Sequence, residues 1–127
     1  MNNVTATMDS YRQTVAQVVS QAAIHLHNAL GPIGTALYDQ HGALILNNNA
    51  LRYASDNDLT RLVFDCLTGS KTAPILCRTA DDVTLYATQL DSHHVFVVVG
   101  EAPDQATVDS FLSNLPRMLP PMPATDD

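Results

Sequence analysis

Histidine is the residue type in this chain that is best suited to chemistry, and two of its five histidines are adjacent. His93 and His94 follow Asp91 and lead into the apolar run VFVVV. Imidazole and carboxylate groups together suit Zn²⁺ or Ni²⁺, and an imidazole alone changes charge near pH ~6. The residues leave three interpretations open: a metal site, a pH switch, or the polar end of a buried strand. We favour the last, since neighbouring residues on a strand point to opposite faces.

Other residues with chemical potential lack the context that catalysis requires. Cys66 and Cys77 have a spacing that matches no zinc or thioredoxin motif, so we expect both thiols to be buried and inert. The sequence contains no G-x-G-x-x-G, no Walker loop, no H-E-x-x-H and no C-x-x-C. The paired carboxylates Asp81 and Asp82 suit a solvated turn. We therefore predict a protein that is not an enzyme and needs no cofactor.

The balance of charge excludes several classes of partner. Six Lys and Arg residues stand against 13 Asp and Glu residues, which gives a formal net charge of −7. Such a chain repels nucleic-acid phosphates and anionic lipid surfaces, so we expect neither partner. The N-terminal residues lack the basic and apolar regions of a signal peptide, and no apolar run approaches the roughly 18 residues of a membrane span. These features predict a cytoplasmic protein, and 127 residues suit one domain.

Three stretches have apolar residues at three- and four-residue spacing, which is typical of amphipathic helices. We expect Thr7 or Asp9 to cap the first helix and Gly31-Pro32 to end it. The second covers residues 57–67, after the capping segment 55–58, and the third starts near Pro103-Asp104. The apolar stripe of the first helix is Tyr11, Val15, Val18, Ala22, Leu26 and Leu30, and that of the second is Leu59, Leu62, Val63, Cys66 and Leu67. The stripe of the third helix is Val108, Phe111, Leu112 and Leu115. Pro116 is expected to end or kink this third helix.

Five short segments predict strands, and two of them form a hairpin. Asp39 opens the hairpin turn and Gly42 supplies the positive φ that closes it. Pro74 cannot donate a ladder hydrogen bond, so its strand is expected at an edge. The run VFVVV does not alternate, which predicts apolar contacts on both faces and a central position. The predicted strands are residues 36–38, 43–46, 74–78, 83–90 and 95–99.

The order of these elements predicts one topology. A hairpin and a three-strand meander place the last strand inside the sheet when that strand pairs with the first. The strand order is then 2-1-5-4-3 in an antiparallel five-stranded sheet, and helices on both faces make a three-layer α/β/α sandwich with the element order αββαβββα. This order brings His41 and Asp39 near Asp91, His93 and His94, because both turns lie at the same end. The alternative metal site would use His41, His93 and His94.

From Met8 to Leu119 the chain resembles the roadblock/dynein light chain family, which has a profilin-like fold. The resemblance rests on the element order, on GTALYDQHGALIL at the hairpin and on VFVVVGE before the last helix. It implies one roadblock-like domain over residues 1–119, followed by a flexible, Pro-rich acidic tail over 120–127. It also implies a non-catalytic homodimeric scaffold, since family members bind small Ras-like GTPases or motor and signalling complexes, and some bacterial members stimulate a GTPase.

The resemblance further implies that the second helix and third strand pair with those of a second copy. A two-fold pairing would cover an apolar edge strand that otherwise favours aggregation. The alternative is a small-molecule sensor of the PAS or GAF type, but LTRLVFDCL has few polar residues on its inward face, which favours the scaffold. The residues expected in the dimer interface are Leu59, Leu62, Val63, Cys66, Pro74, Ile75, Leu76 and Arg78.

Overall fold

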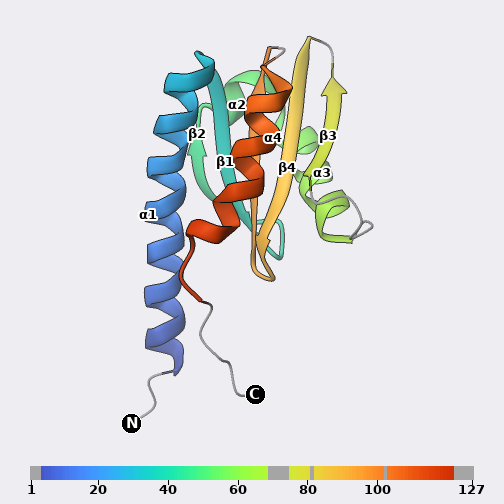
Figure 1. Cartoon of the computed structure of the whole chain (residues 1–127). Helices are drawn as coiled ribbons and strands as arrows, with labels where there is room; N and C mark the ends of the chain where they lie inside the picture. The colour runs from blue at the N-terminus through green and yellow to red at the C-terminus, as the bar shows by residue number, and fades with distance from the viewer. Residues whose placement is uncertain (1–3, 69–74, 81, 102, 122–127) are drawn as a thin grey trace.

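The computed structural model describes residues 4–68, 75–80, 82–101 and 103–121, and they form a three-layer sandwich (Figure 1). Five antiparallel strands follow the order β2-β1-β5-β4-β3, which confirms the predicted topology. Pro74 and residues 122–127 of the predicted tail lie outside the described residues. The elements are α1 (Val4–Leu30), β1 (Ile33–Asp39), β2 (Leu44–Asn48), α2 (Ala50–Tyr53), α3 (Asp56–Thr68), β3 (Ile75–Ala80), β4 (Val83–Asp91), β5 (His94–Gly100), α4 (Gln105–Asn114) and the 3₁₀ helix η1 (Leu115–Met118).

Strand β5 is the centre of the sheet, as its uninterrupted apolar sequence predicts. All seven of its residues are buried, and it pairs with β1 on one side and β4 on the other. Phe96 and Val98 belong to the core cluster under α1 and α4, whereas Val95, Val97 and Val99 belong to the cluster under α3. Because successive side chains of a strand point to opposite faces, β5 contributes to both cores.

Helices α1 and α4 cover one face of the sheet, and α1 projects beyond it (Figure 1). The predicted cap of α1 at Thr7 or Asp9 is wrong, because the helix begins at Val4 and runs through both residues. Its end is as expected: Gly31 has a φ of 86° and its N–H donates to the carbonyl of His27 at 2.8 Å. No helix among the described residues is long and apolar enough to span a membrane.

The last helix stops close to where its proline predicts. The side chain of Asp104 caps α4 by accepting a hydrogen bond from the Thr107 N–H at 3.0 Å. Pro116 stands at the start of η1, so the chain tightens into a 3₁₀ turn after Asn114. Leu115 is buried in the core beneath α1, as the predicted stripe requires.

Helices α2 and α3 cover the opposite face, and α2 has no counterpart among the predicted elements. The predicted capping segment is confirmed for α3, since the Ser55 hydroxyl accepts from the Asp58 N–H at 3.1 Å. The four-residue helix α2 starts after Asn49, which has a φ of 66°, and the Asn47 side-chain oxygen accepts from the Ala50 N–H at 3.0 Å. Strand β2 therefore runs to Asn48, past the predicted end at residue 46, and Asn49 precedes the first turn of a helix.

The β1–β2 hairpin turn forms as its residue types require. The Asp39 carboxylate accepts from the N–H groups of His41 at 2.8 Å and Ala43 at 2.9 Å. Gly42 has a φ of 81°, in the left-handed region that favours glycine. The turn therefore fixes the position of His41 at one end of the sheet.

Candidate functional site

The first candidate site is the surface formed by α3 and β3, which the sequence assigns to a dimer interface. Leu59, Leu62 and Val63 are buried in the core of their own chain, where they pack on the sheet. These three side chains therefore face the core of their own chain, and a partner that contacts α3 would meet mainly its other side. An apolar helical stripe indicates burial, but it does not identify the surface that covers it.

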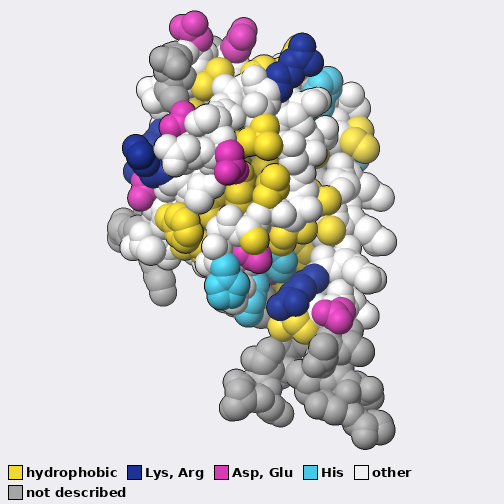
Figure 2. Space-filling view, turned by 180° about the vertical axis from the view of Figure 1, so that it is seen from behind, with side chains coloured by type: hydrophobic (Ala, Val, Ile, Leu, Met, Phe, Trp, Pro, Cys, Tyr) yellow, Lys and Arg dark blue, Asp and Glu magenta, His cyan; other side chains and the backbone are white. Residues whose placement is uncertain are grey.

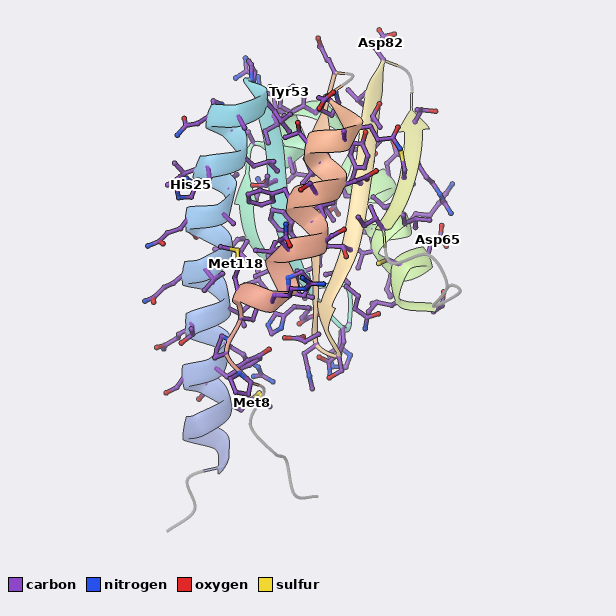
Figure 3. The ribbon with its side chains drawn as sticks, viewed as in Figure 1. Met8, His25, Tyr53, Asp65, Asp82 and Met118 are labelled. Carbon is purple, nitrogen blue, oxygen red and sulfur yellow. The ribbon has the colours of Figure 1, made fainter. Side chains whose placement is uncertain are left out.

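The accessible part of this region lies on the outer side of α3 and along β3. Phe64 is the large apolar residue that α3 exposes, and it lies off the predicted stripe. Asp65 points outward from α3 (Figure 3) and forms an ion pair with Arg78 of β3 at 2.5 Å. Cys66, Ile75 and Leu76 are half-buried. These positions, rather than the core-facing stripe, are available to a partner.

Strand β3 is the outer strand at its end of the sheet, so its outer backbone edge has no paired strand among the described residues. Cys77 is exposed on this edge strand, which overturns the expectation that both cysteines are buried. Beside it, a pocket of about 180 Å³ carries charges of both signs. The pocket is lined by Asp58, Arg61, Leu62, Arg78, Thr79 and Leu85.

The second candidate site is the end of the sheet where the predicted histidines meet. The β1–β2 turn and the β4–β5 turn do lie together, as the strand order predicts, and with α1 they enclose a pocket of about 360 Å³. Figure 2 shows histidine side chains gathered beside a basic one near the lower end of the molecule. The lining residues are Arg12, Asp39, Gln40, His41, Ile45, His93 and His94.

Asp91 is the central group at this end of the molecule; the sequence places it near the histidines but does not predict its hydrogen bond with Tyr11 of α1. Its carboxylate accepts hydrogen bonds from the Tyr11 hydroxyl and from the backbone N–H of His93, the latter at 2.7 Å. The Nδ1 atom of His94 lies 3.0 and 3.1 Å from its two oxygens. His94 is only 2% exposed. The network ties α1 to the junction of β4 and β5.

The ionisation of this network follows from its burial. Burial raises the pKa of the Asp91 carboxyl, but hydrogen bonds from His94, Tyr11 and the His93 backbone lower it, and the net pKa lies below the usual value. Burial, and then the hydrogen bond to Asp91, raises the pKa of the Tyr11 phenol well above its usual value. Asp91 is thus held as a carboxylate and Tyr11 as a neutral donor, so their hydrogen bond fixes α1 to the junction of β4 and β5.

The metal interpretation of the histidines finds no support in this geometry. Among the described residues, no three His, Cys, Asp or Glu side chains are grouped in a way that would hold a metal ion. His94 is engaged by Asp91, and the Nδ1 atom of His93 lies 3.0 Å from the hydroxyl oxygen of Ser92. His25 lies apart from both, on the outer side of α1 (Figure 3).

We therefore expect the melting temperature to be the same in excess Zn²⁺ or Ni²⁺ as in EDTA, because a bound metal would stabilise the native state by mass action. Thermal unfolding of protein purified without a histidine tag measures this. A rise of several degrees with Zn²⁺ that His41→Ala abolishes would restore the metal interpretation.

A buried hydroxyl lies on the opposite face of the sheet, in the cluster covered by α2 and α3. Tyr38 of β1 is 1% exposed, and its hydroxyl has no hydrogen-bond partner among the described residues. Burial, followed by the charge of Asp56, raises its pKa to about 12. The hydroxyl therefore stays protonated and offers an unused donor inside the molecule.

No family model matches the sequence, and no curated protein matches it. Solved structures do match. Myxococcus xanthus MglB superimposes with a TM-score of 0.62 at 15% identity, over 80% of this chain and 84% of that one. A Roadblock/LC7 domain from Streptomyces avermitilis gives 0.59 at 12% identity, over 73% and 87%. MglC from Myxococcus xanthus gives 0.51 at 16% identity, over 87% and 99%. At such identities the similarity is one of fold.

Proposed function

Since this chain has the roadblock/LC7 fold, we propose that it is a non-catalytic regulatory protein that forms a homodimer and binds a protein partner. The free outer edge of β3 is the observation that carries the proposal. A strand at the edge of a sheet offers unpaired backbone groups, and pairing with a second copy satisfies them. One solved relative is described as "MglB with tetrameric arrangement", which supports self-association as a property of the fold.

The surroundings of β3 suit a two-fold contact. Arg78 and Asp65 carry opposite charges on neighbouring elements, so a two-fold axis beside β3 can place each near its opposite in the other copy. The half-buried Leu76 adds apolar surface on the strand itself, whereas the exposed ring of Phe64 lies against Gly42 of the β1–β2 turn. Protein interfaces commonly have an apolar centre surrounded by a rim of polar and charged residues.

The proposed partner is a small Ras-like GTPase, and the proposed location is the cytoplasm. The partner follows from the resemblance to the roadblock/dynein light chain family. A solved relative from Thermus thermophilus is described as "Gliding protein-mglB", which supports a regulatory role rather than a metabolic one.

Native mass spectrometry tests the homodimer first. The wild-type chain is expected at twice 13.7 kDa or at a higher even multiple of 13.7 kDa. Cys77→Glu combined with Arg78→Glu places additional carboxylates on the exposed side chains of β3, so the dissociation constant is expected to rise about 100-fold. Met118→Glu is the matched control, because Met118 is also exposed but lies beside α4 (Figure 3). A folded wild-type monomer at about 100 μM, or an unaffected double variant, would contradict the α3–β3 assignment.

A small-molecule sensor is the second candidate, and the buried Tyr38 hydroxyl favours it. A ligand that accepted a hydrogen bond from this group would satisfy it inside the core. The same native spectra decide the matter: a monomer that carries an adduct lost in Tyr38→Phe supports the sensor. A dimer with no adduct supports the scaffold.

A further inference from the structure

The surface at the opposite edge of the sheet is almost free of charge. From Gln13 to Leu51, Asp39 is the only Asp, Glu, Lys or Arg, although the chain has 19 such residues, 6 basic and 13 acidic. This span contains most of α1, all of β1 and β2, and the start of α2. Figure 2 shows the result: between charged side chains at its top and bottom, the right-hand side of the molecule carries only apolar, histidine and uncharged side chains.

Strand β2 lies on this surface as the outer strand of the sheet, and its flanks expose apolar side chains. The exposed large hydrophobic residues number six among the described residues, and four of them lie on β2 or beside it, with exposures between 40% and 57%. They are Leu44 and Ile45 on β2, Ile24 on α1 and Leu51 on α2. Edge strands are commonly protected by Lys or Pro, and β2 has neither.

A groove of about 230 Å³ runs between α1 and β2 along this edge, and no residue that lines it is charged. Val19 and Ala23 of α1 and Leu37 and Leu46 of the sheet give it an apolar floor. A strand placed beside β2 would direct alternate side chains into this space. The hairpin end of β2 is irregular, because its register with β1 shifts between Leu37 and Tyr38, so the regular part of the edge begins near Leu46.

We propose that this β2 edge binds a second copy of the same chain, through a surface separate from α3 and β3. Two copies of a chain with a net charge of −7 repel each other, so they associate most readily where neither presents a carboxylate. A basic partner would gain affinity from the acidic surfaces instead. A surface depleted of charge and enriched in exposed apolar side chains therefore fits a partner as acidic as the chain itself.

The contact is isologous. A two-fold axis perpendicular to the sheet pairs β2 with the β2 of the second copy in antiparallel fashion, and it places the two α1 helices side by side on one face. Ile24 is then positioned to pack against the other α1. The proposal does not depend on the α3–β3 dimer, because it uses the other end of the sheet.

The test separates the two surfaces by sedimentation velocity. In the Cys77→Glu, Arg78→Glu background, the chain is expected to form a weaker dimer that now uses β2 alone. Adding Ile24→Lys and Ile45→Lys is expected to raise the dissociation constant of that dimer about 100-fold, whereas Met118→Lys changes it little. Both target residues are exposed, so unchanged circular dichroism and melting temperature should accompany the loss. Raising NaCl from about 50 to about 500 mM should strengthen the β2 dimer, because salt screens the repulsion of the like-charged copies.

Each outcome assigns the failure to one surface. If Cys77→Glu with Arg78→Glu gives a monomer at every concentration to about 1 mM, the β2 proposal is overturned while the α3–β3 dimer stands. If the lysine pair in the wild-type background removes all association, the β2 contact stands and the α3–β3 assignment fails. If the lysine pair leaves self-association intact but weakens capture of another protein, the occupant of β2 is that protein and our proposal is wrong.

Discussion

Asp91→Ala is expected to lower the free energy of unfolding by about 3 kcal/mol at neutral pH, among the largest effects of any single polar substitution in this chain. The change leaves the Tyr11 hydroxyl and the Nδ1 atom of the buried His94 without their shared acceptor. Urea unfolding followed by far-ultraviolet circular dichroism measures it. Tyr11→Phe removes one donor and should cost about 1 kcal/mol, and Asp9→Ala, at an exposed carboxylate of the same helix, should cost much less.

The dependence of this stabilisation on pH has a defined sign. The pKa of Asp91 is lower in the folded state than in the unfolded chain, so its contribution is fully present above about pH 4 and is lost as the pH falls through the folded pKa. The pKa of Tyr11 is raised, so its contribution is lost as the pH rises above about 10. Asp91→Asn should therefore flatten the acid limb of the stability profile, and Tyr11→Phe the alkaline limb. An acid limb identical in wild type and Asp91→Asn would contradict the stabilising role of the Asp91 carboxylate.

Gly34→Ala is the second substitution with a large expected effect. A Cβ at this position would lie 2.5 Å from the Asn49 carbonyl oxygen and 2.6 Å from the Ala50 Cα. Both atoms are backbone, so no rotamer change relieves the overlap, and α2 has to move away from β1. We expect a loss of about 3 kcal/mol in the free energy of unfolding and shifted amide resonances in α2.

Gly100→Ala is the matched control for this strand position. Its added Cβ would come no closer than 3.0 Å, and the atom it meets is the Cγ2 methyl of Ile33, a side chain that can adjust. We expect a cost below about 1 kcal/mol. Equal costs for the two glycine substitutions would mean that α2 does not pack on β1 as described.

The sheet could be predicted from the sequence because its signals are local. VFVVV can only be a strand with apolar cover on both faces, and Asp39 with Gly42 specifies the hairpin turn by its own hydrogen bonds and φ. Those two features, with short connections, leave few ways to order five strands. The resemblance to a roadblock domain then follows from topology, even though sequence identity to the solved relatives is only 12–16%.

The missed features depend on contacts between distant residues or on which surface covers a side chain. Tyr11 and Asp91 are 80 positions apart, so no local sequence pattern predicts their hydrogen bond. Helix α2 depends on Asn49 adopting a left-handed conformation, which the run of three asparagines permits but does not require. The stripe of α3 looks the same whether its own sheet or a second copy covers it. Cys77 resembles its buried neighbours in sequence, and only its place on the outer strand exposes it.

The pairing of β1 with β5 has a consequence for how the chain folds during synthesis. The hairpin of β1 and β2 leaves the ribosome early, but the inner edge of β1 stays open until His94–Gly100 has emerged. Until then, the nascent chain exposes an apolar strand with unpaired backbone groups, which favours aggregation with neighbouring nascent chains. Pairing two strands that are so far apart in the sequence also slows folding, because the long segment between them has to close before the contacts form. Chaperone capture during translation is therefore expected to matter more for the yield of this protein than the stability of its finished fold.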